Sequence, residues 1–141
     1  MKSRLIYWLT YAGMWLLALL PFKVLYILSD GLCFLMHHVV HYRRRVVRAN
    51  LCNAFPEKSA AELRDIEREF YRYICDYMLE EVKMLRMSFK ELCRRMEYDN
   101  KEEYLAMIEK HGGIVLLIPH YANFEWITGM SSIMQEGDIP V

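Results

Sequence analysis

Two apolar runs dominate the first forty residues. The first covers residues 5–22, LIYWLTYAGMWLLALLPF, and holds eighteen residues without a charged side chain. That length is near the lower limit for a helix that spans a bilayer. Lys2 and Arg4 precede the run as in a signal peptide, but the small residues of a cleavage site do not follow it. The pattern therefore predicts a retained membrane helix.

The second run, residues 24–41, is less uniform. Asp30 interrupts it, and His37, His38 and His41 close it, so burying all of it in hydrocarbon would be costly. We expect a segment that lies in the membrane interface, with these histidines in interfacial or capping positions. The alternative is a two-helix hairpin, which would leave the basic residues before and after it on one side of the membrane, as the positive-inside rule prefers.

Three S/N-x-x-E patterns then mark helix starts. They begin at Ser59, Ser88 and Asn100, and the first two are capping boxes. Apolar residues recur near the helical period after each start, and Gly112 is a favoured residue at a helix C-terminus. The predicted helices run from Ser59 to about Met87, from Ser88 to about Tyr98, and from Asn100 to Gly112.

The pattern changes after Gly112. Residues 113–118, GIVLLI, form a short continuous apolar run that ends at Pro119, as is typical of a fully buried strand. Residues 123–134 return to a helical pattern, and residues 139–141 resemble the start of another strand. A buried strand needs partners on both edges. We therefore predict an α/β fold of which this chain supplies a truncated part: a membrane helix, a helical segment and the first strands of a sheet.

Composition and charge divide the chain in two. The 141 residues, within the usual size of one domain, are 55% hydrophobic and 26% charged. Residues 1–50 carry seven Lys or Arg and one acid, a net charge of +6, whereas residues 51–141 carry eleven bases and seventeen acids, a net charge of −6. We predict a membrane anchor and interfacial segment in residues 1–41, and a folded body in residues 42–141.

A basic cluster joins these two parts. Arg43, Arg44, Arg45 and Arg48 directly follow the apolar runs, where each base near anionic headgroups contributes about 1 kcal/mol. Nucleic-acid binding is the competing interpretation. It is disfavoured because the cluster adjoins membrane-type sequence and no recognition motif accompanies it.

The four cysteines form no C-x-x-C pair and have no His in ligand spacing. We predict free thiols in a reducing compartment and no metal site.

The candidate chemistry lies in HYANFE, where Glu125 follows His120 by five residues. The spacing alone is weak, because five His and 18 acids in 141 residues give about 0.6 such matches by chance. In a continuous helix the two side chains would lie roughly 140° apart, so they meet only if His120 lies in a turn before a helix that carries Glu125. The carboxylate would then orient the imidazole as a general base. A purely structural histidine is the alternative.

The context makes the resemblance specific. GGIVLLIPHYANFEW, residues 112–126, is similar to the first motif block of the lipid A biosynthesis acyltransferases, and residues 42–59, YRRRVVRANLCNAFPEKS, resemble the segment after that family's N-terminal anchor. The resemblance implies that His120 is the general base, that Glu125 orients it, and that Asn123 shapes the turn and binds substrate. Residues 42–141 would be the incomplete N-terminal part of an acyltransferase domain.

The chain departs from the family pattern at two positions: Ala122 stands where Gly is usual, and Phe124 where Trp is usual. Both replacements roughly keep size and apolarity.

The implied activity is transfer of a fatty acyl group from an acyl carrier protein thioester to a hydroxyl of a lipid A precursor. It would take place at the cytoplasmic face of a bacterial inner membrane, without a cofactor. Lysophospholipid acyltransferases also have H-x4-acid, but usually place Ser and Asp where this chain has Asn123 and Glu125. An inactive membrane-anchored fragment is a further alternative.

Overall fold

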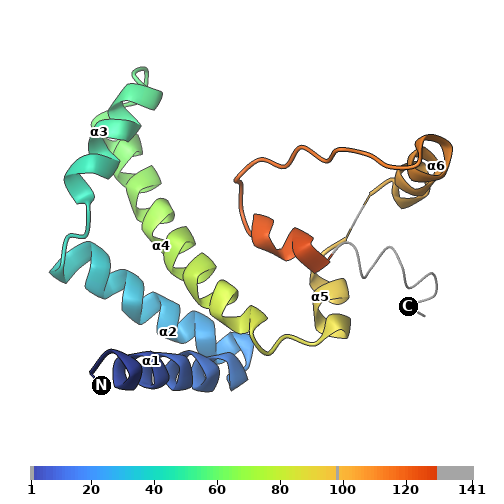
Figure 1. The fold of residues 1–141 in the computed structure, drawn as a ribbon. Helices are drawn as coiled ribbons and strands as arrows, with labels where there is room; N and C mark the ends of the chain where they lie inside the picture. Colours follow the sequence, from blue (N-terminus) through green and yellow to red (C-terminus); the bar gives the residue numbers. More distant parts are fainter. Residues whose placement is uncertain (1, 98, 130–141) are drawn as a thin grey trace. The chain divides into compact units, whose positions relative to one another are not determined.

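The computed structural model describes residues 2–97 and 99–129. The chain divides into two compact units, Met1–Lys83 and Met84–Val141. The predicted boundary after residue 41 concerns membrane attachment and stays a prediction. The elements shown in Figure 1 are α1 (Lys2–Leu19), α2 (Phe22–Phe34), the π-helical segment η1 (Leu35–Val39), α3 (Arg44–Ala54), α4 (Ala60–Met84), α5 (Phe89–Arg95), α6 (Lys101–His111) and the 3₁₀ segment η2 (Phe124–Gly129).

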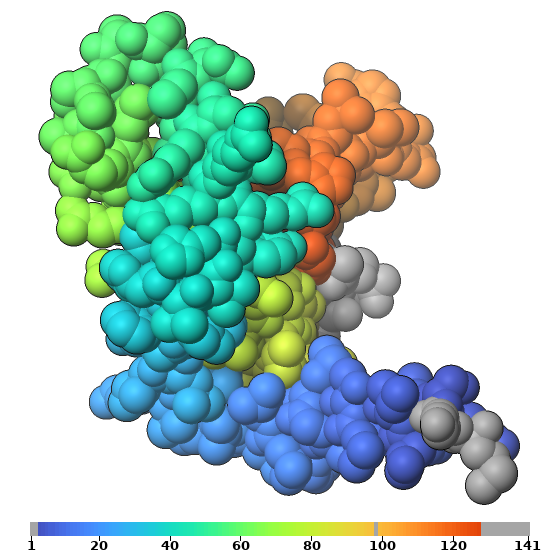
Figure 2. Space-filling view, turned by 90° about the vertical axis from the view of Figure 1, so that its left-hand side faces the viewer, coloured from blue at the N-terminus to red at the C-terminus, as the bar shows by residue number. Residues whose placement is uncertain are grey.

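Pro21 divides the first apolar run. It is the N-cap residue of α2, in an extended conformation that a helix interior does not allow, so α1 ends before it. Within the described residues, one helical stretch has the length and mean hydropathy needed to cross a membrane, Phe22–Val39, at a mean hydropathy of 1.2. Length and composition alone select it, and a signal sequence or a buried helix would pass the same criterion. Most of the large apolar side chains of α1, in blue in Figure 2, are 37% to 64% exposed.

In the first unit, α2 and η1 run antiparallel to α4 (Figure 1). The Tyr26 hydroxyl donates to Glu80 at 2.7 Å near one end of this pair, and the Cys75 thiol lies 3.7 Å from the Met36 sulfur further along. The residues buried along the interface include Leu25, Tyr71 and Cys75, and polar side chains also lie there. The core of this unit is therefore a narrow seam between helices.

Lys83, near the end of α4, donates hydrogen bonds to the corner between α1 and α2. Its ammonium donates to the carbonyl oxygens of Ala18 and Leu20, each at 2.8 Å, and lies 5.7 Å from the ring centroid of Phe22. These carbonyls belong to the C-terminal end of α1, where intrahelical donors are missing. A side chain more than sixty residues away therefore satisfies them.

The predicted start of α4 is confirmed. The Ser59 backbone N–H donates to the Glu62 carboxylate at 2.8 Å, and the Glu62 N–H donates back to the Ser59 hydroxyl at 3.3 Å. This reciprocal pair is the capping box that the sequence predicted. The helix ends at Met84, within one turn of the predicted end.

The two shorter helices are confirmed as well. Ser88 caps α5 by accepting from the Glu91 N–H at 3.2 Å. Helix α6 ends at Gly112, which has a left-handed φ of 73°. Asn100 makes no side-chain cap bond, because its own backbone is left-handed at φ 58°. Tyr98, the predicted end of the second helix, lies outside the described residues.

The predicted α/β class is wrong for this chain. Residues 113–119 are extended but pair with no neighbour, and the described part of the chain contains no strand. Val115 and Leu117 are each 89% exposed. An apolar run fits a buried strand only where other strands hydrogen-bond to it, and the sequence of the run does not supply them. The second predicted strand, residues 139–141, lies outside the described residues.

Candidate functional site

In the second unit, a tight turn carries the predicted site residues. The Tyr121 N–H donates to the Pro119 carbonyl at 2.9 Å, and the Trp126 N–H donates to the Asn123 carbonyl at 3.0 Å, where η2 begins. His120 therefore lies in the turn, and Glu125 lies in the first turn of the following helix. This is the local arrangement that the predicted pair requires. The predicted helix over residues 123–134 is 3₁₀ as far as Gly129, and its remainder lies outside the described residues.

The His120 ring is exposed and packs against Phe124, with ring centroids 4.3 Å apart and ring planes at 55°. Glu125 is half-buried. The ring contact of the imidazole is with Phe124. The roles of His120 and Glu125 as a catalytic pair thus stay a prediction.

A cavity of about 390 Å³ lies beside this turn. Asn123, Phe124 and Trp126 contribute to its wall from the loop and η2, and Arg95 and Met96 contribute from the end of α5. Trp126 is only 6% exposed, and its indole N–H has no acceptor among the described residues. The cavity is an apolar space with a cation and the Asn123 side chain at its wall. Within the described residues, no group of three His, Cys, Asp or Glu side chains could hold a metal ion.

Comparison with known proteins decides the family. The sequence profile of the bacterial lipid A biosynthesis acyltransferases matches residues 1–138, nearly the whole chain. The chain belongs to this family. Its members are acyltransferases, so the predicted resemblance is confirmed.

A relative within the family is the lipid A biosynthesis lauroyltransferase of Escherichia coli (strain K12). It is 28% identical over 122 residues, which are 84% of this chain and 40% of that enzyme. The chain thus spans about two fifths of the length of this relative. No solved structure matches the chain.

The backbone conformation of Ala122 bears on one departure from the family pattern. Its φ is 52°, in the left-handed region, where a Cβ is unfavourable and glycine is preferred. The family resemblance implies glycine here, and alanine in this conformation leaves a strained backbone one residue before Asn123. Side-chain size and apolarity alone do not reveal this backbone strain.

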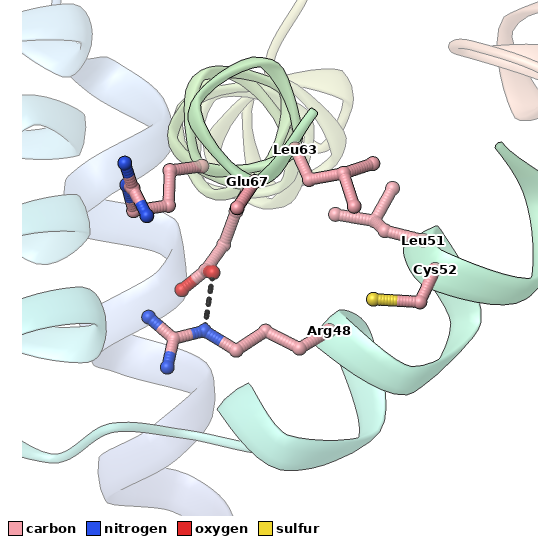
Figure 3. A pocket seen from close by; sticks show the side chains of 7 residues that line it. Arg48, Leu51, Cys52, Leu63 and Glu67 are labelled. Carbon is pink, nitrogen blue, oxygen red and sulfur yellow. Dashed lines mark hydrogen bonds and ion pairs between the residues drawn. The ribbon is translucent and has the colours of Figure 1, made fainter. Parts of the chain in front are cut away.

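A second group of interacting residues was not predicted at all. Glu67 on α4 is 2% exposed, and its two carboxylate oxygens accept from Nε of Arg44 and Nε of Arg48, each at 2.6 Å. Figure 3 shows the contact with Arg48. Nε2 of His37 in η1 lies 3.1 Å from the same carboxylate. Burial raises the pKa of the Glu67 carboxyl, but the hydrogen bonds from Arg48, Arg44 and His37 outweigh it, and the net pKa lies below its usual value.

Two signals in the sequence could have indicated this cluster. Arg44 and Arg48 are four residues apart, so they share one face of α3. Glu67 interrupts an i, i+4 series of otherwise non-acidic residues, Leu63, Tyr71 and Cys75, on the inner face of α4. The sequence predicts that the arginines lie near lipid headgroups and that His37 takes an interfacial or capping position. Neither prediction includes a buried acid as their partner.

Proposed function

We propose that the protein transfers a fatty acyl group from an acyl carrier protein thioester to a hydroxyl of a lipid A precursor. The family match across residues 1–138 carries this proposal, because it includes the whole HYANFE turn. The name of the E. coli relative, a lauroyltransferase of lipid A biosynthesis, agrees with a lipid acceptor. Acyl carrier protein and the lipid acceptor would be the two partners.

In this proposal His120 is the general base. Its exposed imidazole takes the proton of the acceptor hydroxyl as the oxygen attacks the thioester carbonyl, and Glu125 stabilises the imidazolium that forms. The C–O bond then replaces the C–S bond, and the imidazolium returns the proton to the departing thiolate. Phe124, which packs on the ring at 4.3 Å between centroids, limits its rotation.

Substrate binding is proposed for Asn123 and the cavity beside it. Asn123 lies in the wall next to the apolar side chains of Ile118, Phe124 and Ile127. Binding sites for small ligands are commonly apolar spaces with a few convergent polar groups. An acyl chain fits such a wall, and the amide of Asn123 would hold a polar atom of the substrate.

Attachment to the inner membrane through the N-terminal helices is also proposed. Most of the large apolar side chains of α1 are 37% to 64% exposed, a surface that water disfavours and lipid tolerates. The basic flanks favour a cytoplasmic position for the remainder of the chain, including His120.

Acyl transfer by purified protein tests the proposal. It is assayed with acyl carrier protein thioester and a lipid A precursor, both for the 141-residue chain and for a chimera in which the chain replaces the matching segment of the lauroyltransferase. His120→Ala should lower kcat by about 10² to 10⁴-fold, and Glu125→Gln should be severe too because it removes the orienting charge. His111→Ala, a histidine of α6 outside the turn, is the matched control.

A loss below about threefold at His120 would reject the general base, since assistance of this kind is worth far more. Full turnover of Glu125→Gln would leave Glu125 as a helix-terminal acid and remove the pair. A lysophospholipid acceptor used better than the lipid A precursor would favour the alternative activity. Absence of transfer in both protein forms would favour the inactive fragment.

A further inference from the structure

The contact of Glu67 with its two arginines leaves most of each guanidinium unused. A guanidinium has five N–H donors, and Arg44 and Arg48 each contact the carboxylate through Nε alone. Figure 3 shows Nε of Arg48 in the bond to Glu67 and one terminal nitrogen directed away from the carboxylate. The side chains of Arg44 and Arg48 are 27% and 50% exposed. Glu67 therefore holds each guanidinium group through Nε, and both arginine side chains remain partly exposed to solvent.

A third arginine stands beside this pair. Arg64, one turn before Glu67 on α4, is in none of the ion pairs formed within the described part of the chain. It lines two neighbouring hollows of about 230 and 150 Å³, and Glu67 lines both of them as well. Arg48 lines the larger hollow and Arg44 the smaller. We call Arg44, Arg48 and Arg64 the arginine site.

The described residues do not balance the charge of the arginine site. Three guanidinium groups face one carboxylate, Glu67, which leaves a net charge of +2. The smaller hollow also contains Asp65 and Arg68, but these two pair with each other. A dianion, or an anion with several acceptor oxygens, would complete the site.

The larger hollow adds an apolar wall. Leu51, Cys52, Ala60 and Leu63 line it next to Arg48 (Figure 3). The site is thus amphipathic, with cations at one end and carbon surface at the other. Arg44 and Arg48 follow the apolar N-terminal segment in the sequence, and bases in that position favour anionic lipid headgroups.

We propose that the arginine site binds the phosphate group of a membrane lipid, with Glu67 as the residue that positions the arginines. The phosphate oxygens accept from the open guanidinium forks, and the first part of the lipid chain lies along Leu51 and Leu63. The inference does not depend on acyl transfer, because the arginine site lies wholly in the first unit, whereas His120 belongs to the second unit.

Calorimetric titration of the full chain in neutral detergent micelles tests this. The ligands are dihexanoyl phosphatidic acid, dihexanoylglycerol with the same chains and no phosphate, and inorganic phosphate. We expect phosphatidic acid to bind at least about tenfold more tightly than either of the others. Arg64→Ala should weaken that binding by about tenfold or more, the usual effect of losing a charge-assisted hydrogen bond. Its fold should survive, because Arg64 has no acidic partner among the described residues.

Arg72→Ala is the control, because it removes the same charge from the same helix while Arg72 pairs with Glu69 and lines neither hollow. Its affinity should stay within twofold of the parent chain. Equal affinity of the Arg64→Ala and parent chains would overturn the proposal. Inorganic phosphate binding as tightly as the lipid would overturn the lipid as ligand, and dihexanoylglycerol doing so would overturn the role of phosphate.

Discussion

Glu67 is a buried charge whose retention depends on its partners. An unpaired carboxylate at 2% exposure would be very unfavourable, and removing one member of a buried ion pair commonly destabilises a protein by about 3–5 kcal/mol. We expect Glu67→Gln to lower the free energy of unfolding by about 3 kcal/mol in denaturant titrations. Glu69→Gln, on an exposed face of the same helix, should change it by less than about 0.5 kcal/mol. Equal effects of the two variants would contradict the buried ion-pair network.

The same carboxylate predicts a dependence on pH. Its pKa in the folded protein is depressed by Arg48, Arg44 and His37, whereas in the unfolded chain it is about 4.3. A depressed pKa stabilises the fold above the unfolded value, and this contribution disappears as pH falls through the folded value. The stability difference between the parent chain and Glu67→Gln should therefore be constant at neutral pH and shrink below about pH 4. A difference that stays constant into strong acid would show that charge is not its source.

Ala122 holds a strained backbone at the predicted site. Its φ of 52° lies where an L residue is disfavoured by about 1–2 kcal/mol. Ala122→Gly should therefore raise the free energy of unfolding by about 1 kcal/mol, measured by denaturant titration, despite the greater freedom of glycine in the unfolded chain. Ala106→Gly, in the middle of α6, should lower it by about 0.5–1 kcal/mol. Effects of the same sign at both positions would contradict the left-handed conformation.

Among the elements, α4 depends on its first turn. The Ser59 hydroxyl accepts from the Glu62 N–H, and removal of such a cap typically costs about 1 kcal/mol. We expect Ser59→Ala to lower the free energy of unfolding by that amount and Ser59→Asp to restore most of it, because Asp caps as well as Ser does. Unchanged stability of Ser59→Ala would place the start of the helix elsewhere.

The extended segment gives a direct test of the corrected fold. Leu117 is 89% exposed, whereas Leu25 in α2 is 1% exposed. Leu117→Ser should change the free energy of unfolding by less than about 0.5 kcal/mol, and Leu25→Ala should lower it by about 2–5 kcal/mol. A large loss at Leu117 would mean that the segment is buried after all.

Local patterns predicted the helices well and the sheet badly, for one physical reason. Caps at Ser59 and Ser88 and the glycine at 112 act within a few residues, so the sequence shows them directly. A strand depends on partners elsewhere, which the run at residues 113–118 does not reveal. The location of His120 in a turn followed from its neighbours, whereas the Glu67 cluster joins residues 19 to 30 positions apart and required the packing of α3 on α4.

At the scale of the whole molecule, the open apolar surface of α1 is the main determinant of the proposed membrane attachment. Leu9 and Leu16 are 64% and 61% exposed, and a charge inside hydrocarbon is unfavourable by about 2.5–3.5 kcal/mol. The double variant Leu9→Glu and Leu16→Glu should move a large fraction of the protein from the membrane pellet to the soluble fraction. Leu105→Glu on α6 should leave the distribution unchanged. Full retention of the double variant would mean that α1 is not the anchor.

The hydrogen bonds from Lys83 to the α1–α2 corner can form only after Lys83 has been synthesised. During synthesis, the carbonyls of Ala18 and Leu20 emerge more than sixty residues before the ammonium that they accept from. At roughly 5–20 residues per second, that interval lasts about 3 to 13 s. The corner between α1 and α2 is therefore synthesised before the residue that bonds to it. Under the proposed membrane attachment, the two helices would enter the membrane first, and the hydrogen bonds from Lys83 would form afterwards.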